Sequence, residues 1–433
     1  MEINIVSTEI IKPSSPTPPH LRTHKLSGID QVSTDCFFQF ILFFSGEANS
    51  PIKSSGVLKQ SLSKALTRYY PLAGRVKDEV SVDCDDYGVA FVEARVAGEL
   101  SDILKQPNDG FLLKLVPFKL NNKPDLPVSL IIQTTYFSCG SMAICAGFSH
   151  TIADISTAAN FIKCWASIAC GSNIYNGTAD AISDCTSFFP QQNLSGFSKS
   201  SFYRAYFEPT ENITKRFIFD GEKIAALRDK RRDESSSGYR PTRFEAVSSL
   251  ILGGLMTAAR EEDEFNYRYL VARTPVNLRS KMNPPLPELS IGNIVQLTTA
   301  NWPIEKTVDY NKLIEKLHES IVLINDEYVR KVHAGGYLNY MKSSMEGPST
   351  DVNSIKNITI TSWMRLPFYQ VDFGWGKPTR VVSLTNSNDI AMLLDTPDEK
   401  GIEALVGLSK KEMAKFEQDP GILAYASTGT GLL

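Results

Sequence analysis

The chain has 433 residues, of which 42% are hydrophobic and 21% are charged. These proportions are typical of folded globular proteins and exclude a largely disordered chain, and the length is sufficient for two or three hydrophobic cores. Because 45 Lys and Arg residues nearly balance 48 Asp and Glu residues, net charge gives no reason to expect nucleic acid or an anionic membrane as a partner.

The N-terminal residues predict neither export nor membrane anchoring. They contain no basic head followed by an apolar core. The apolar stretches Phe37–Phe44 and Leu250–Ala259 are shorter than the roughly 20 residues that a membrane span needs. Seven scattered cysteines form no Cys-x-x-Cys pair, which suits reduced thiols. We therefore expect a cytoplasmic protein, and a monomer.

The first half of the chain alternates helical and strand patterns. Apolar residues recur at helical spacing over Val57–Tyr70, and Pro71 ends that pattern. Val80–Val92 predicts a strand hairpin whose turn holds Asp85 and Asp86 in solvent. Two strands and a helix are predicted next, over Pro127–Phe137, Ser141–Phe148 and Ser156–Cys170.

The second half begins after a stretch in which the periodicity is lost, from Gly171 to about Thr214. The sequence predicts one domain over residues 1–190, a crossover linker over 191–214 and a second domain over 215–433. Strands are expected at Lys215–Asp220, Tyr269–Val276, Ile358–Met364, Val381–Thr385 and Ala391–Leu394, and helices at Gly221–Asp229, Arg243–Arg260, Val308–His333 and Ser409–Asp419. This mixture predicts an α/β fold with two similar-sized, mixed-sheet domains.

Several chemistries lack their sequence signatures. There is no Gly-x-Ser-x-Gly nucleophile elbow, no phosphate-binding P-loop and no Gly-x-Gly-x-x-Gly dinucleotide fingerprint. The five histidines show no metal-ligand spacing with one another or with cysteine. We therefore expect no metal and no permanently bound cofactor.

His150 is the strongest candidate for chemistry. It follows a strand pattern that is apolar throughout, in the segment Ser149-His150-Thr151-Ile152-Ala153-Asp154. Strand ends often carry catalytic residues, and a neutral imidazole is a natural general base near neutral pH. The alternative is a core histidine that is hydrogen-bonded to Asp154 and has no catalytic role.

A second motif, Asp372-Phe373-Gly374-Trp375-Gly376, predicts a tight aromatic turn near the end of the chain. Together with His150-x-x-x-Asp154 it resembles the signature of the plant BAHD acyltransferases, which transfer acyl groups from coenzyme A. Tyr69–Arg75, Val276–Ser280 and Ile360–Trp363 are also similar to blocks of that family, so the resemblance covers essentially the whole chain.

Within the family the chain looks most like the alkaloid acetyltransferases typified by vinorine synthase. That similarity is carried by four segments, Lys12–Pro18, Lys59–Arg75, Ser81–Val96 and Asn277–Asn293. Ile155 stands where many family members have glycine, and we interpret it as a marker of this branch.

The resemblance implies two domains of the CoA-dependent acyltransferase type with a channel between them, and a role for each motif residue. The candidate catalytic residues are His150 as general base, Asp154, and Thr361 and Trp363 on the oxyanion side. Asp154 is expected to pair with Arg279 and to fix the loop that aims His150. Gly292 and Asn293 are expected to line the CoA channel, whereas Asp372, Gly374, Trp375 and Gly376 are expected to be structural.

The charged run Arg228–Arg232 offers an alternative contact for the nucleotide phosphates, although a solvated helix face is the favoured interpretation. The resulting hypothesis is an acetyl-CoA-dependent O-acetyltransferase that acts on a plant specialised metabolite, with an alkaloid alcohol as the acceptor. Two alternatives remain, an N-acyltransferase acting on an amine and a non-catalytic homologue that only binds ligand.

Overall fold

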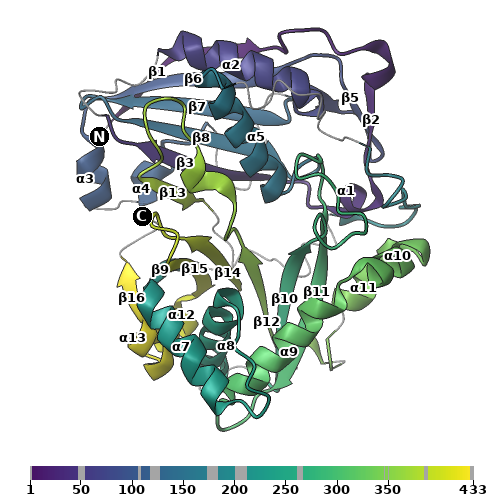
Figure 1. Cartoon of the computed structure of the whole chain (residues 1–433), viewed down its shortest axis with the longest axis vertical. Helices are drawn as coiled ribbons and strands as arrows, with labels where there is room; N and C mark the ends of the chain where they lie inside the picture. The colour runs from purple at the N-terminus through teal and green to yellow at the C-terminus, as the bar shows by residue number, and fades with distance from the viewer. Residues whose placement is uncertain are drawn as a thin grey trace.

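The computed structural model describes residues 2–46, 54–105, 109–117, 127–172, 184–199, 212–260, 267–345, 347–349, 351–384 and 389–429. Two large mixed sheets dominate these residues, one in the upper and one in the lower part of Figure 1, each with helices packed against it. This arrangement confirms the predicted α/β fold with two sheet domains. The predicted linker, residues 191–214, lies partly outside the described residues, so the domain boundaries stay predictions.

The first sheet has six strands in the order β1 (Ile3–Ile11), β6 (Val89–Val96), β7 (Leu130–Phe137), β8 (Met142–Ser149), β3 (Phe37–Phe44) and β13 (Arg380–Ser383). Helices α2 (Ser55–Arg68) and α5 (Ile155–Ala169) lie together across it (Figure 1). Every residue of β8 is buried, as expected for an apolar run flanked by strands on both sides. This burial holds the end of β8, and therefore His150, in a rigid position.

The second sheet has seven strands in the order β11 (Val295–Pro303), β10 (Tyr269–Asn277), β12 (Ile355–Ser362), β14 (Ile390–Asp395), β15 (Ile402–Ser409), β9 (Asn212–Phe219) and β16 (Ala426–Gly429). Its principal helices are α7 (Gly221–Glu234), α8 (Arg243–Arg260), α9 (Tyr310–Leu323), α12 (Lys410–Phe416) and α13 (Pro420–Tyr425). The shorter elements are β2 (Thr23–Lys25), β5 (Ser81–Asp83), β4 (Arg75–Val76), α1 (Gly28–Val32), α3 (Leu100–Lys105), α4 (Asp109–Leu112), α10 (Asp326–Ala334) and α11 (Tyr337–Met345), together with 3-10 turns at Pro19–Leu21, Tyr70–Ala73, Val352–Ser354 and Pro367–Gln370.

One strand crosses between the halves. β13 belongs by sequence to the second half but pairs antiparallel with β3 in the first sheet, with Val381 opposite Leu42. On its outer side Arg380 donates to Glu403 of the second sheet at 2.8 Å. The first sheet is therefore completed by residues from the C-terminal part of the chain.

Two local predictions were wrong. β5 and β6 are not a hairpin, because β5 pairs with β2 and β4 whereas β6 pairs with β1 and β7. The acidic turn between them is not free in solvent either: Arg75 donates to Asp85 and Thr17 donates to Asp86, so both carboxylates anchor neighbouring segments.

The single helix predicted over Val308–His333 is two helices, α9 and α10. Asn325 separates them, since its side chain accepts from the backbone N–H of Tyr328 and so begins α10. None of the helices in the described residues is long and apolar enough to cross a membrane.

Two buried histidines predict that the fold loses stability in mild acid. His24 and His333 are 4% and 3% exposed, and burial lowers the pKa of each from 6.5 to about 4. Between those values the unfolded chain binds protons that the folded chain does not, so the free energy of unfolding must fall as pH drops below 6.5. Each histidine can remove about 3 kcal/mol.

Urea unfolding followed between pH 7.5 and pH 5 measures this effect. His333→Leu should flatten the pH dependence, because the Leu side chain takes up no proton, whereas the same change at His20, for which the structure shows an exposed side chain, should leave the slope intact. An unchanged slope in His333→Leu would contradict the prediction.

Candidate active site

His150 lies at the point where β8 ends and the chain turns into α5. Its backbone N–H donates to the carbonyl of Cys36 at 2.8 Å, so the β3–β8 ladder extends to this residue. Its ring meets the ring of Phe38 edge to face, with the centroids 5.0 Å apart. The residue is only partly buried.

Asn293 fixes the orientation and the protonation of the His150 ring. The Asn293 amide nitrogen donates to a carboxylate oxygen of Asp30 at 3.0 Å and to the carbonyl of His150 at 2.8 Å. Both partners are acceptors, so the amide oxygen is the atom that lies 2.9 Å from Nδ1 of His150. Nδ1 must therefore carry the proton, and Nε2 keeps the lone pair that a general base needs.

Asp30 is a residue of the site that sequence reasoning missed. Its carboxylate is 2% exposed and accepts four hydrogen bonds, from the backbone and side chain of Asn293 and from the backbone and side chain of Ser27. The Ser27-x-x-Asp30 capping box of α1 was the signal available in the sequence. Burial raises the pKa of Asp30, while its donors act in the opposite direction.

Gly292 lies directly against this carboxylate. Its φ is +132°, and a Cβ at this position would be 3.3 Å from both oxygens of Asp30, so the backbone conformation and the close approach both favour glycine. Gly292 and Asn293 thus contact Asp30, His150 and Thr157. Their expected contact with CoA stays a prediction.

Asp154 points away from His150 and forms the expected pair with Arg279. Two guanidinium nitrogens donate to its carboxylate at 2.7 and 3.1 Å, and the backbone N–H groups of Thr157 and Ile294 also donate to it. Burial alone would raise the pKa of Asp154, but the positive charge of Arg279 and these hydrogen bonds hold it below its ordinary value. The pair joins Asp154, the residue immediately before α5, to Arg279, which follows β10.

Thr361 lies near the end of β12 in the second sheet, and Trp363 directly follows that strand. Trp363 is buried, with its ring edge to face against Phe40 and tilted against Phe368. A row of aromatic rings connects it to His150 through Phe40, Phe148 and Phe38, with successive centroids about 5 to 6 Å apart. Trp363 thus belongs to the same aromatic cluster as the base, and the oxyanion role stays a prediction.

The Asp372–Gly376 turn packs against the first domain. The carboxylate of Asp372 accepts from the backbone N–H groups of Gly374 and Gly376, both of which have positive φ. The rings of Phe373 and Trp375 stack on one another and meet Phe44 of β3 edge to face. The turn thus fastens the second half of the chain to β3, the strand that pairs with β8.

Comparison with known proteins identifies the family. A family model described as the transferase family matches residues 1–423. The chain belongs to this family, the BAHD acyltransferases. It is 55% identical to epi-neemfruitin B synthase L1AT of Melia azedarach and 54% identical to a limonoid 1-O-acetyltransferase of Citrus sinensis, each covering 100% of both chains. The crystal structure of vinorine synthase has a TM-score of 0.81 and 32% identity, covering 98% of this chain and 99% of that one.

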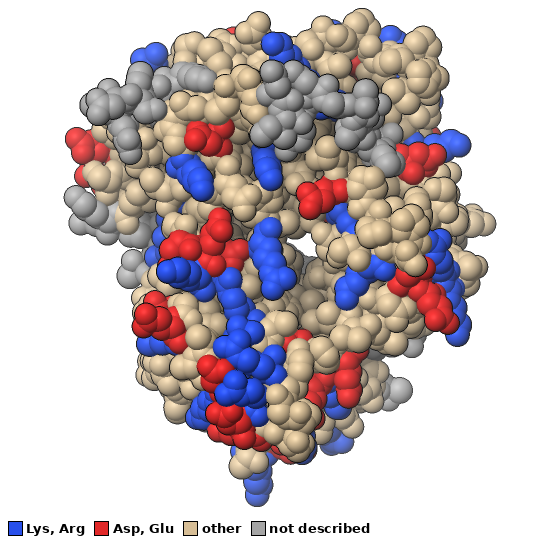
Figure 2. Space-filling model, viewed as in Figure 1, with Lys and Arg blue, Asp and Glu red and all other residues tan. Residues whose placement is uncertain are grey.

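This BAHD chain has an opening near its centre, at the level where the two halves meet, with Lys and Arg side chains on both sides of it (Figure 2). The basic run of α7 contributes little free charge: Arg231 pairs with Glu234, and Arg232 pairs with Asp229 and Asp233. Arg231 is buried and lies over the ring of Tyr310, so the run Arg228–Arg232 is not the fully solvated face that was expected. A phosphate contact there stays a prediction.

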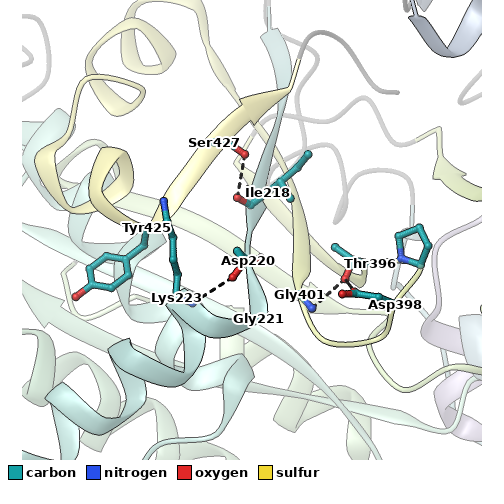
Figure 3. A pocket seen from close by; sticks show the side chains of 10 residues that line it. Ile218, Asp220, Gly221, Lys223, Thr396, Asp398, Gly401, Tyr425 and Ser427 are labelled. Atoms are coloured by element: carbon teal, nitrogen blue, oxygen red, sulfur yellow. Dashed lines mark hydrogen bonds between the residues drawn. The ribbon is translucent and has the colours of Figure 1, made fainter.

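A surface pocket of about 390 Å³ lies elsewhere, between the start of α7, the β14–β15 turn and β16 (Figure 3). Its two carboxylates are already used, since Asp220 caps α7 and Asp398 accepts from Thr396 and from the N–H of Lys400. None of the candidate catalytic residues lines this pocket, so it is separate from the candidate site. The described residues contain no cluster of acidic, His and Cys side chains suited to a metal ion.

Proposed function

We propose that this BAHD protein is an acetyl-CoA-dependent O-acetyltransferase whose acceptor is a hydroxyl group of a limonoid-type triterpenoid. The two relatives at 55% and 54% identity, one of them named as a limonoid 1-O-acetyltransferase, support this acceptor. Vinorine synthase, which typifies the alkaloid branch, is 32% identical. We therefore favour a limonoid alcohol over the alkaloid alcohol expected from the sequence motifs.

The observation that carries the proposal is the fixed tautomer of His150. With Nδ1 donating to Asn293, Nε2 accepts the proton of the acceptor hydroxyl while that oxygen attacks the thioester carbonyl. The imidazolium then returns the proton to the departing CoA thiolate, so the enzyme ends in its initial protonation state. Thr361 and Trp363 would donate to the oxyanion, a contribution typically worth about 3 to 4 kcal/mol of barrier per donor.

Direct transfer in a ternary complex is favoured because the neighbouring nucleophiles are enclosed. Cys145 and Ser149 both belong to β8 and are 1% and 5% exposed. Burial also raises the pKa of the Cys145 thiol, which keeps the thiol protonated and weakly nucleophilic. Neither residue is suited to carry an acetyl group between the two substrates.

Kinetics with varied acetyl-CoA and a limonoid alcohol test this proposal. We expect product and free CoA in equal amounts, intersecting initial-rate plots, and no acetylated peptide after acetyl-CoA is mixed with the enzyme alone. A stoichiometric acetyl group on Cys145 or Ser149 would overturn direct transfer. The same assay with amine acceptors addresses the N-acyltransferase alternative, and the absence of CoA release with every alcohol and amine would favour a non-catalytic homologue.

A further inference from the structure

Phe38 differs from the other aromatic residues of β3. Phe37, Phe40, Phe43 and Phe44 are all buried, whereas Phe38 is only partly buried although it lies within the same strand. One side of its ring is used in the protein, where it stacks on Phe148 at a centroid distance of 5.8 Å and an interplanar angle of 13°. The ring also meets the imidazole of His150 edge to face, with the two centroids 5.0 Å apart.

This position places the Phe38 ring beside the group that would deprotonate the acceptor. An acceptor hydroxyl must approach Nε2 to hydrogen-bond distance, about 2.6 to 3.2 Å. The Phe38 ring centroid is only 5.0 Å from the imidazole centroid, so the skeleton of a large acceptor bound at Nε2 can extend over the phenyl ring, whereas a small alcohol need not touch it. Burial of apolar surface against an apolar ring contributes favourable binding free energy. A polycyclic acceptor offers a large apolar surface, whereas a two-carbon acetyl group does not.

The charges around His150 point to the same kind of acceptor. Among the described residues, Asp30 and Asp154 are the buried carboxylates that contact residues of this site, and each already accepts four hydrogen bonds. Neither has room for an ammonium group. Asp35, just before β3, is exposed, and an exposed ion pair contributes little binding free energy.

We propose that Phe38 is a specificity-determining residue: it forms the apolar wall on which the acceptor skeleton packs, and the acceptor is therefore an uncharged polycyclic alcohol. This inference rests on the proposed function. It goes further by assigning the wall to one residue and by excluding acceptors that carry a protonated amine beside the reacting hydroxyl.

Steady-state kinetics of Phe38→Ala and Phe38→Leu test the wall directly. With a neutral triterpenoid alcohol, Phe38→Ala should raise the KM of the acceptor about 10-fold to 100-fold, the range expected for one lost phenyl contact. Phe38→Leu should be intermediate, and the KM of acetyl-CoA should not change. With a small alcohol that cannot reach the ring, the KM of the acceptor should not change in either variant.

Phe161→Leu is the matched control, because Phe161 also packs against Phe148 but is fully buried. It should lower the melting temperature without changing the preference between the large and the small acceptor. If Phe38→Ala behaves in the same way, its role is structural and the proposal is wrong. A rise in the KM of acetyl-CoA instead would place Phe38 on the thioester side and would also overturn it.

The second arm compares the neutral alcohol with a polycyclic amino alcohol of similar size, assayed below and above the pKa of its amine. The wild-type kcat/KM should be low for the charged form and should recover when the amine is neutral, after correction for the pH profile of the neutral substrate. Equal kcat/KM for the two charge states would refute the uncharged-acceptor inference while leaving the proposed function intact. Failure of the wild-type protein to release CoA with any alcohol would instead refute the proposed function.

Discussion

His150→Ala is expected to lower kcat by roughly a hundredfold or more, since general-base catalysis typically contributes about 10²-fold to 10⁴-fold. The side chain contacts Asn293 and Phe38 and is only partly buried, so the fold and acetyl-CoA binding should persist. Turnover measured beside thermal unfolding and acetyl-CoA binding tests this. A variant that keeps more than a few per cent of the wild-type rate would contradict the assignment of the base.

The pH profile gives a second measurement of the same group. Burial lowers the pKa of His150 from its ordinary value of 6.5, and the base must be unprotonated to act. The value of kcat/KM should therefore be level above neutrality and should fall as pH decreases below 6.5, with its midpoint on the acid side of 6.5. The residual activity of His150→Ala should not show this decrease of kcat/KM at acidic pH.

Asp154→Ala is expected to destabilise the protein by about 3 to 5 kcal/mol as well as to reduce activity. Asp154 and Arg279 are both nearly inaccessible, with side chains that are 3% and 6% exposed. Removal of the carboxylate leaves a buried guanidinium without its counter-charge, and the loop that carries His150 also loses the bonds from Thr157 and Ile294. Urea unfolding measures the stability, and kcat measures the displaced base.

Three further variants separate the contributions to this effect. Asp154→Asn should be intermediate, because it keeps the shape and one acceptor for Arg279. The double variant Asp154→Leu with Arg279→Met should be less destabilised than the sum of the two single changes, since neither charge is left alone. Asp233→Ala, which removes an exposed partner of Arg232, should change stability little. Additive losses in the double variant would argue against a coupled pair.

The sequence predicted the individual elements better than their pairing. The helix Arg243–Arg260 has the predicted bounds, and the strands β7 and β8 pair as adjacent antiparallel neighbours. These elements have strong local periodicity. The prediction of a hairpin over Val80–Val92 was wrong because local turn residues cannot show that β5 and β6 belong to different sheets.

The contacts of the candidate site also fall into those that could be predicted from the sequence and those that could not. The contact between Asp154 and Arg279 followed from family resemblance, and the structure contains it. The contact of Asn293 with Asp30 joins residues 263 positions apart, and no local pattern encodes such a distance. Phe38 was likewise hidden, because it stands among the aromatic residues of a largely apolar run, and the sequence does not show which of those rings are buried.

The strand exchange made by β13 has a consequence for how this protein can be divided. If the chain were cut in the crossover region and the first half produced alone, β3 would become an open sheet edge, with an apolar and aromatic sequence from Phe37 to Phe44. Such an edge offers unpaired N–H and C=O groups to any other chain and favours aggregation. The dependence runs in one direction, since the second sheet takes no strand from the first half. A fragment made from the first half should therefore include β13 to cover the edge of β3.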